Sequence, residues 1–557
     1  MAKPTYMYER ALDPSQPEVR IVSILPGPQS STVKCHLETV SLAHEPTFTC
    51  LSYTWGDPCN LSTIELNEHP FSVTKSLAIA LRHLRDECQV VVIWADAICI
   101  NQQDLDEKAT QVPRMTEIYN KSKKVIIWLG EEAEDSCYAM NFIHGIDRRL
   151  ASRAPRLRED YLAMAQAFDD RALRAINRLL QRPWWSRAWI IQEATCDNET
   201  FVRCGGDVTD FTAFVATINC LVYYVVRLSL RGHGILDTRQ LQRVIALDQL
   251  REQRGQSKYR PCLLNMLDTF RTCEASDPRD KIFALSALVT GRGKEAATPD
   301  YSISVDQAYS KFAYLFILSD RTLGILGHCQ VAVRTIQSWS SFKLITPDLI
   351  PKSVLPSWVP DWTMMLETTP FEHYQKPGVD QSERVYNATG SFPPSVHFTG
   401  GLDTLFVRGF TFDRILFISP EASSAQLTTI KSWYLWVETK FGSTYFTGES
   451  IREAFLRTIV ADVSVSEGRC VRGGQAKWPV QDEAGSLEGS FDSQLLIRIA
   501  IHSRRFFVSE KGYMGLARFD AIIGDQICLL HGGSVPFILR QKGEMHHLFR
   551  ANAMFTA

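Results

Sequence analysis

Apolar runs alternate with amphipathic stretches in the first 200 residues of the chain. Four runs favour β-strands, namely residues 19–25, 48–53, 90–94 and 124–129. The last two are continuously apolar, as expected for strands that are buried on both faces of a parallel sheet. Residues 75–84 and 104–119 carry apolar side chains at helical spacing between these runs. The order of strand, helix, strand, helix and strand predicts a parallel α/β sheet flanked by helices.

The pattern changes twice further along the chain. Residues 172–180, 185–195 and 210–255 have helical patterns, whereas 401–420 and 503–540 alternate as β-strands do. We therefore predict three regions. Residues 19–205 form an α/β domain, residues 206–340 form a mainly helical extension, and residues 341–557 form a mixed, strand-rich α+β region.

Composition describes an ordinary globular protein with more than one core. At 557 residues the chain exceeds what a single core supports. Its 60 basic and 62 acidic side chains nearly cancel, which removes the electrostatic argument for a nucleic-acid-binding protein. Residues 218–230 form the most apolar long stretch, and 13 residues are too few to span a bilayer. No apolar signal segment opens the chain, so we expect a cytoplasmic protein with no membrane span.

Five motifs follow one another between residues 51 and 193. They are LSYTWG at 51–56, WADAICINQ at 94–102, QVPRM at 111–115, WLG at 128–130, and RPWWSRAW at 182–189 followed by Gln192 and Glu193. Together they resemble the fungal heterokaryon incompatibility (HET) domain, in which the second motif usually reads WIDAICINQ. Segments at 276–285, 299–301, 356–362 and 524–540 are similar to those that follow HET domains, whereas the end of the chain departs from their usual last strand.

HET domains are distantly similar to TIR domains, which have a flavodoxin-like fold and of which some cleave NAD. The spacing of Trp189 and Glu193 resembles the TIR W-x-x-x-E helix, so the resemblance implies Glu193 as the candidate catalytic residue and NAD as the candidate substrate. Nicotinamide leaves NAD as a neutral group while positive charge develops on the ribose. A carboxylate can stabilise that charge, and the reaction requires no metal and no further cofactor.

The carboxyl ends of neighbouring parallel strands meet at one edge of a sheet, where ligands bind in open α/β folds. Two groups of residues follow predicted strands and are candidate substrate-binding residues: Tyr53, Trp55, Gly56 and Asp57, and Asp96 and Asn101. Tyr53 and Trp55 could stack on a flat ring, and Asp96 or Asn101 could bind a polar group.

Each candidate has a structural alternative. Glu193 could form an ion pair with an arginine such as Arg187, and Asp96 could fix a helix start or a loop. Trp184, Trp185 and Trp189 are candidates for core or interface packing. The acidic cluster Asp104, Asp106 and Glu107 is expected to be a solvated first helical turn, with no metal bound.

Two functions are compatible with these patterns. The first is a signalling protein of fungal non-self recognition that triggers growth arrest or cell death, with NAD cleavage as its candidate activity. The second is a non-catalytic module that associates with itself or with a protein partner, with the tryptophan-rich segment as its interface. An exposed Glu193 beside Tyr53 and Asp96 would favour the first, and a Glu193 buried against an arginine would favour the second.

Overall fold

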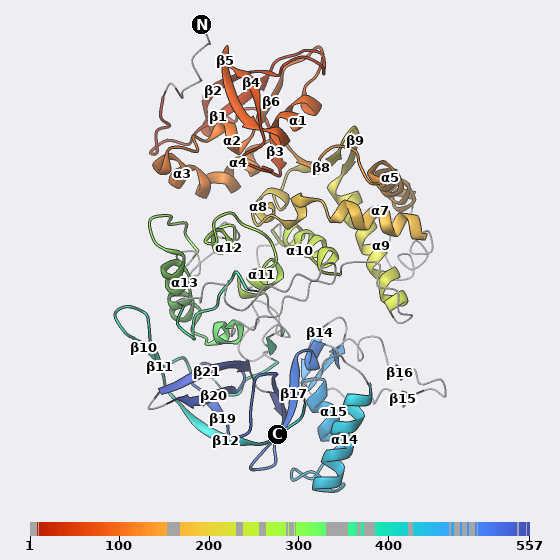
Figure 1. Ribbon diagram of the computed structural model, residues 1–557, viewed down its shortest axis with the longest axis vertical. Helices are drawn as coiled ribbons and strands as arrows, with labels where there is room; N and C mark the ends of the chain where they lie inside the picture. Colours follow the sequence, from red (N-terminus) through yellow and green to blue (C-terminus); the bar gives the residue numbers. More distant parts are fainter. Residues whose placement is uncertain are drawn as a thin grey trace. The chain divides into compact units, whose positions relative to one another are not determined.

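The chain forms two compact units (Figure 1). The first comprises Met1–Pro261, Thr272–Thr290 and Ala297–Ser302, and the second comprises Cys262–Arg271, Gly291–Ala296 and Ile303–Ala557. The computed structural model describes residues 8, 10–152, 168–229, 238–254, 263–285, 288, 295, 297–329, 355–364, 368, 370–371, 385–390, 392–420, 427–466, 469–472, 480–481, 487–488, 496–497, 499–542, 545–552 and 554–556. The predicted division at residues 205 and 340 stays a prediction.

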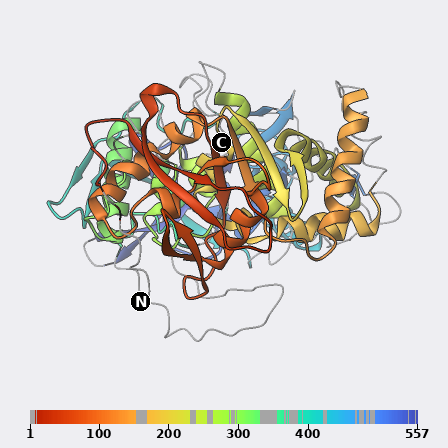
Figure 2. The same ribbon diagram turned by 90° about the horizontal axis from the view of Figure 1, so that it is seen from above.

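A nine-stranded sheet organises the first unit, with the strand order β5-β4-β2-β1-β6-β3-β7-β8-β9. In chain order its strands are β1 (Glu18–Ile24), β2 (Lys34–Ser41), β3 (Thr49–Tyr53), β4 (Leu61–Leu66), β5 (His69–Thr74), β6 (Val91–Trp94), β7 (Lys124–Trp128), β8 (Glu199–Cys204) and β9 (Asp207–Asp210). Figure 2 shows these strands, coloured red to yellow, from a second direction.

The central strands confirm the parallel arrangement that the apolar runs predict. Strand β3 pairs in parallel with both β6 and β7, and β7 pairs in parallel with β8. All five residues of β3 are buried. The continuous apolar runs therefore correspond to strands covered on both faces.

The sheet is nevertheless mixed, so the expectation of a parallel sheet is wrong for its other half. Strand β1 pairs antiparallel with both β2 and β6, and β4 pairs antiparallel with β5. Strands β2 and β4 alternate in burial over part of their length, β5 has a single buried residue, and all three carry polar side chains, so they lack the apolar signature of the central strands. A flavodoxin-like or TIR-like fold remains a prediction.

Short helices connect the central strands. Helix α1 (Lys75–Leu84) begins at Thr74, whose side chain accepts a hydrogen bond from the Leu77 amide, and it buries one apolar face. The connection from β6 to β7 contains α2 (Asp96–Cys99), α3 (Leu105–Gln111), η2 (Val112–Arg114) and α4 (Met115–Lys121). Helix α1 lies against β3, β4 and β5, whereas α4 lies against α8.

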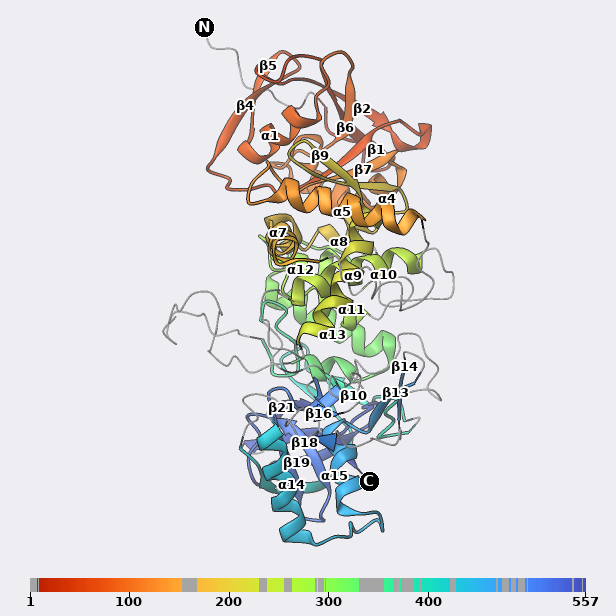
Figure 3. The same cartoon turned by 90° about the vertical axis from the view of Figure 1, so that its right-hand side faces the viewer.

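The segment after β7 is mostly helical, and it includes α5 (Ser136–Ser152), α7 (Asp170–Leu180), η3 (Pro183–Ser186), α8 (Ile190–Ala194), α9 (Phe211–Ser229), α10 (Thr238–Arg254) and α12 (Asp280–Phe283). Helix α5 packs against α7 and α9 (Figure 3). The single helix expected over residues 185–195 is divided by extended backbone at Arg187. A short 3₁₀ helix, η1 (Leu42–His44), follows β2.

The second unit is built on an antiparallel seven-stranded sheet with the order β21-β20-β19-β12-β17-β18-β22. These strands are β12 (Gly409–Ile418), β17 (Arg504–Ser509), β18 (Met514–Arg518), β19 (Gln526–Leu530), β20 (Phe537–Lys542), β21 (Met545–Asn552) and β22 (Met554–Thr556). They confirm the strand patterns over 401–420 and 503–540. The last residues form a strand, β22, paired with β18.

Smaller elements complete the second unit. The helices are α11 (Leu263–Thr269), α13 (Val305–Asp320), η6 (Gly324–His328), α14 (Leu427–Phe441) and α15 (Ile451–Ile459), and α14 lies against α15. The strand pairs are β10 (Val396–Phe398) with β11 (Leu405–Val407), β13 (Val463–Ser466) with β14 (Arg469–Arg472), and β15 (Val480–Gln481) with β16 (Leu487–Glu488). Among the described helices, none is long and apolar enough to cross a membrane.

Candidate functional site

Glu193 lies on α8 and is only 1% exposed. Its two carboxylate oxygens accept hydrogen bonds from the guanidinium of Arg187 over 3.0 and 3.2 Å. Burial raises the pKa of Glu193, and the Arg187 charge acts in the opposite direction. Burial alone would lower the pKa of Arg187, but the Glu193 and Asp96 carboxylates hold it above its ordinary value. Glu193 is therefore a buried member of an ion pair.

The end of β3 completes the surroundings of this carboxylate. The Ser52 hydroxyl donates a hydrogen bond to Glu193 and accepts one from Nε1 of Trp184 over 2.7 Å. Trp184 and Trp185 are buried and pack edge to face, with ring centroids 4.7 Å apart. Their burial within this chain agrees with the packing role expected of them and leaves them no surface for a partner.

Asp96 begins α2 beside this ion pair. Its carboxylate accepts one hydrogen bond from Nε1 of Trp55 over 2.9 Å and another from the backbone amide of Ala97 over 2.8 Å. Burial raises the pKa of Asp96, and Arg187 opposes that shift. The Tyr53 hydroxyl is buried beside Asp96, and burial together with the Asp96 charge raises the pKa of Tyr53. We refer to Tyr53, Asp96, Arg187 and Glu193 as the carboxylate cluster. Because Asp96 is half-buried and Trp55 is 38% exposed, this cluster reaches the surface on the side of Trp55.

Asp280, Ala284 and Tyr301 of the first unit form a further part of the site that the sequence did not indicate as one. Asp280 accepts hydrogen bonds from Nε1 of Trp189 over 3.1 Å and from the Tyr301 hydroxyl over 2.6 Å. Gln192 donates to the Ala284 carbonyl over 2.9 Å. The helix that carries Glu193 is thus held by a segment about 90 residues later in the chain. Asp277 and Arg279 form an ion pair over 2.6 Å in the same segment.

Asp280→Asn should destabilise the first unit by about 1–3 kcal/mol, because one of two buried donors loses its acceptor. Burial raises the pKa of Asp280 above its ordinary value, so the native state holds this proton more tightly than the unfolded state does. Below the ordinary pKa of an aspartate, Asp280 contributes its full stabilisation. That stabilisation is lost as the pH rises through the raised pKa that Asp280 has in the folded state. The difference in unfolding free energy between wild type and variant should accordingly be larger at pH 4 than at pH 7, as denaturant titrations would measure. Exposed Asp197→Asn is the matched control, and an equal effect of both substitutions would contradict the prediction.

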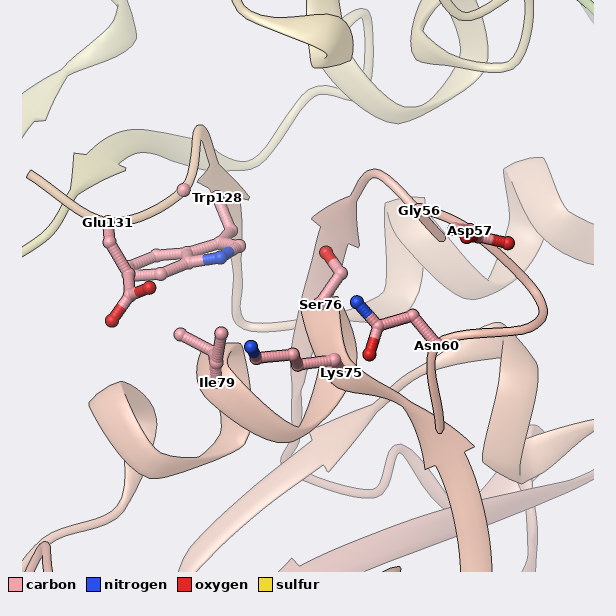
Figure 4. Close-up of a pocket in the computed structure, with 9 residues that line it drawn as sticks. Gly56, Asp57, Asn60, Lys75, Ser76, Ile79, Trp128 and Glu131 are labelled. Atoms are coloured by element: carbon pink, nitrogen blue, oxygen red, sulfur yellow. The ribbon is translucent and has the colours of Figure 1, made fainter. Parts of the chain in front are cut away.

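Gly56 and Asp57, the remaining candidates after β3, lie away from this cluster. They line a pocket of about 270 Å³ together with α1 and the end of β7 (Figure 4). The Asp57 carboxylate points away from that space and accepts a hydrogen bond from the Cys59 amide over 2.9 Å. Asn101 fixes its own loop by accepting a hydrogen bond from the Gln103 amide over 3.2 Å. The single predicted binding site is therefore divided between two places.

The acidic cluster at the start of α3 requires a correction. Asp104 caps the helix by accepting from the amides of Asp106 and Glu107, and Asp106 is exposed as expected. Glu107 is instead 6% exposed and forms a bidentate ion pair with Arg20 over 2.6 and 2.9 Å. Within the described ranges, no group of three or more His, Cys, Asp or Glu side chains could hold a metal ion.

The comparisons with known proteins agree with the five motifs. Residues 48–193 match the family model described as heterokaryon incompatibility protein (HET). The chain carries a HET domain. Heterokaryon incompatibility protein 6, OR allele, of Neurospora crassa is 26% identical over 473 residues, which are 74% of this chain and 66% of that protein. The HET-domain chain thus spans just under two thirds of its relative's length. No solved structure is significantly similar to it.

Proposed function

We propose that this chain is a signalling protein of fungal non-self recognition whose HET domain triggers growth arrest or cell death. The observation that carries the proposal is the alignment with the Neurospora heterokaryon incompatibility protein, which extends over 473 residues and so reaches well beyond the HET domain. A protein partner, or a second copy of the chain, is the trigger that such a role requires.

The proposal is tested by controlled expression in a fungal host, with growth, viability and protein level measured together. Arrest or death at a protein level that an unrelated protein tolerates supports it. Normal growth at that level, also after fusion of two strains that carry different alleles of the gene, would overturn it.

The geometry of Glu193 favours a non-catalytic mode of action. A carboxylate that stabilises charge on a substrate must touch the substrate, but both oxygens of this one are held by Arg187 and Ser52 at 1% exposure. We expect the purified chain to leave NAD intact while its expression arrests growth. Liquid chromatography of released nicotinamide measures the first property, and light scattering of the purified chain measures self-association.

NAD cleavage is the second candidate, and the position of Asp96 supports it. Asp96 as a residue is half-buried and accepts a hydrogen bond from exposed Trp55, so it lies nearer the surface than Glu193 does. If the domain cleaves NAD, Asp96→Asn should lower the rate by about 10²- to 10³-fold. Because one of the two donors to Asp96 then loses its acceptor, the melting temperature should also fall, and the rates are compared at a temperature where both proteins are folded. Release of nicotinamide by wild type and by Asp96→Asn at equal rates would remove Asp96 from the reaction.

A further inference from the structure

The pocket beside Gly56 lies at the topological switch point of the parallel strands. From β3 the chain moves to β6 on one side, and it then returns past β3 to β7 on the other. The loops after β3 and β7 meet at the carboxyl edge of the sheet, which is where open α/β folds form a ligand crevice. The pocket is lined there by both of these loops and by the first turn of α1.

Three polar side chains face the pocket without partners. Figure 4 shows the Lys75 ammonium, the Asn60 amide and the Glu131 carboxylate directed toward a common space. None of the three side chains forms an ion pair or hydrogen bond with another described residue. All three residues are exposed, so the pocket presents one cation, one carboxylate and one amide to a ligand from solvent. A ligand with an acidic group at one end and hydrogen-bond donors at the other would complement them.

Apolar side chains form the wall between these polar groups. The Trp128 indole and the Ile79 side chain face the same space in Figure 4. The Trp128 indole also packs against the His83 ring, with the ring centroids 4.8 Å apart. Burial lowers the pKa of His83, which disfavours a charge on this imidazole. Gly56 has a φ of 77°, which favours glycine and leaves the rim free of a side chain.

We propose that this pocket binds a small polyhydroxylated molecule that carries an anionic group, such as a sugar phosphate. The anionic group lies against Lys75 and Asn60, the hydroxyl groups donate hydrogen bonds to Glu131, and the carbon skeleton contacts Trp128 and Ile79. A pocket of about 270 Å³ accommodates a pentose phosphate but not a whole dinucleotide. This inference does not depend on the proposed function, because binding requires neither cell death nor NAD cleavage.

The test is isothermal titration calorimetry of the full chain at low ionic strength with ribose 5-phosphate, inorganic phosphate and ribose. Ribose 5-phosphate should bind most tightly. Lys75→Met should weaken the binding of ribose 5-phosphate and of phosphate by about tenfold or more, since a charge-assisted contact is lost. Glu131→Gln should weaken the binding of ribose 5-phosphate several-fold, while phosphate binds equally well or more tightly.

Matched controls come from the opposite edge of the sheet. Lys123 directly precedes β7 and Glu199 begins β8, and both are exposed. Lys123→Met and Glu199→Gln should leave every affinity unchanged, and melting temperatures verify that all four variants are folded. The proposal is overturned if wild type binds none of the three probes at millimolar concentration. It is also overturned if the control variants weaken binding as much as the pocket variants do.

Discussion

Arg187→Met should lower the free energy of unfolding of the first unit by about 3–5 kcal/mol, because it leaves the buried Glu193 carboxylate without its cation. Burial already raises the pKa of Glu193, and loss of Arg187 raises it further. Protonation of Glu193 in the variant will reduce this loss of unfolding free energy. Its deficit relative to wild type should therefore grow as the pH rises, in denaturant titrations from pH 5 to pH 8.

The double variant separates a structural from a catalytic Glu193. Glu193→Gln alone also breaks the pair, whereas Arg187→Met combined with Glu193→Gln leaves no buried charge and should be more stable than Arg187→Met alone. Arg174→Met is the control, because that guanidinium is 56% exposed and its pair with Asp170 is at the surface. A Glu193→Gln variant as stable as wild type would contradict the assignment of Glu193 as a structural ion-pair member.

Apolar continuity predicts the central strands because burial on both faces removes the alternation of polar and apolar residues. The outer strands could not be predicted in this way. Lys34–Ser41 alternates and has several polar residues, so only its antiparallel pairing with Glu18–Ile24 reveals it as a strand. The helix over residues 75–84 is the opposite case, because its apolar spacing and its cap at Thr74 are both local features of the sequence.

The site could be predicted only in part, for a related reason. Tyr53 ends β3 and Asp96 follows β6, and these two strands pair in parallel, so their order explains why the two residues and Glu193 influence one another electrostatically. The partners of these residues depend on long-range packing, which residue spacing does not encode. Asp280 contacts Trp189 from 91 positions away, and the pocket beside Gly56 depends on Trp128, whose motif indicated only a strand end.

Glu107→Gln should also destabilise the first unit by about 3–5 kcal/mol, since it leaves the Arg20 guanidinium buried without a counter-charge. Both side chains of this pair are 4% exposed. Arg20 also donates hydrogen bonds to the backbone carbonyls of Cys99 and Arg10. The Glu107 carboxylate also accepts a hydrogen bond from the Asn101 amide over 2.7 Å. The pair therefore joins β1 to the loop that follows Asp96. Thermal and denaturant unfolding of the purified chain measure the loss.

Asp106→Asn is a control at the neighbouring position of the same helical turn. The Asp106 side chain is exposed, so its loss removes only an interaction with the helix dipole, worth less than about 1 kcal/mol. Two adjacent acidic residues in one sequence cluster should thus differ several-fold in their effect on stability. Equal, small effects would show that Arg20 and Glu107 are solvated, which is what the sequence pattern alone predicts. A large loss for Glu107 alone would show that the loop after Asp96 is held by a buried charge.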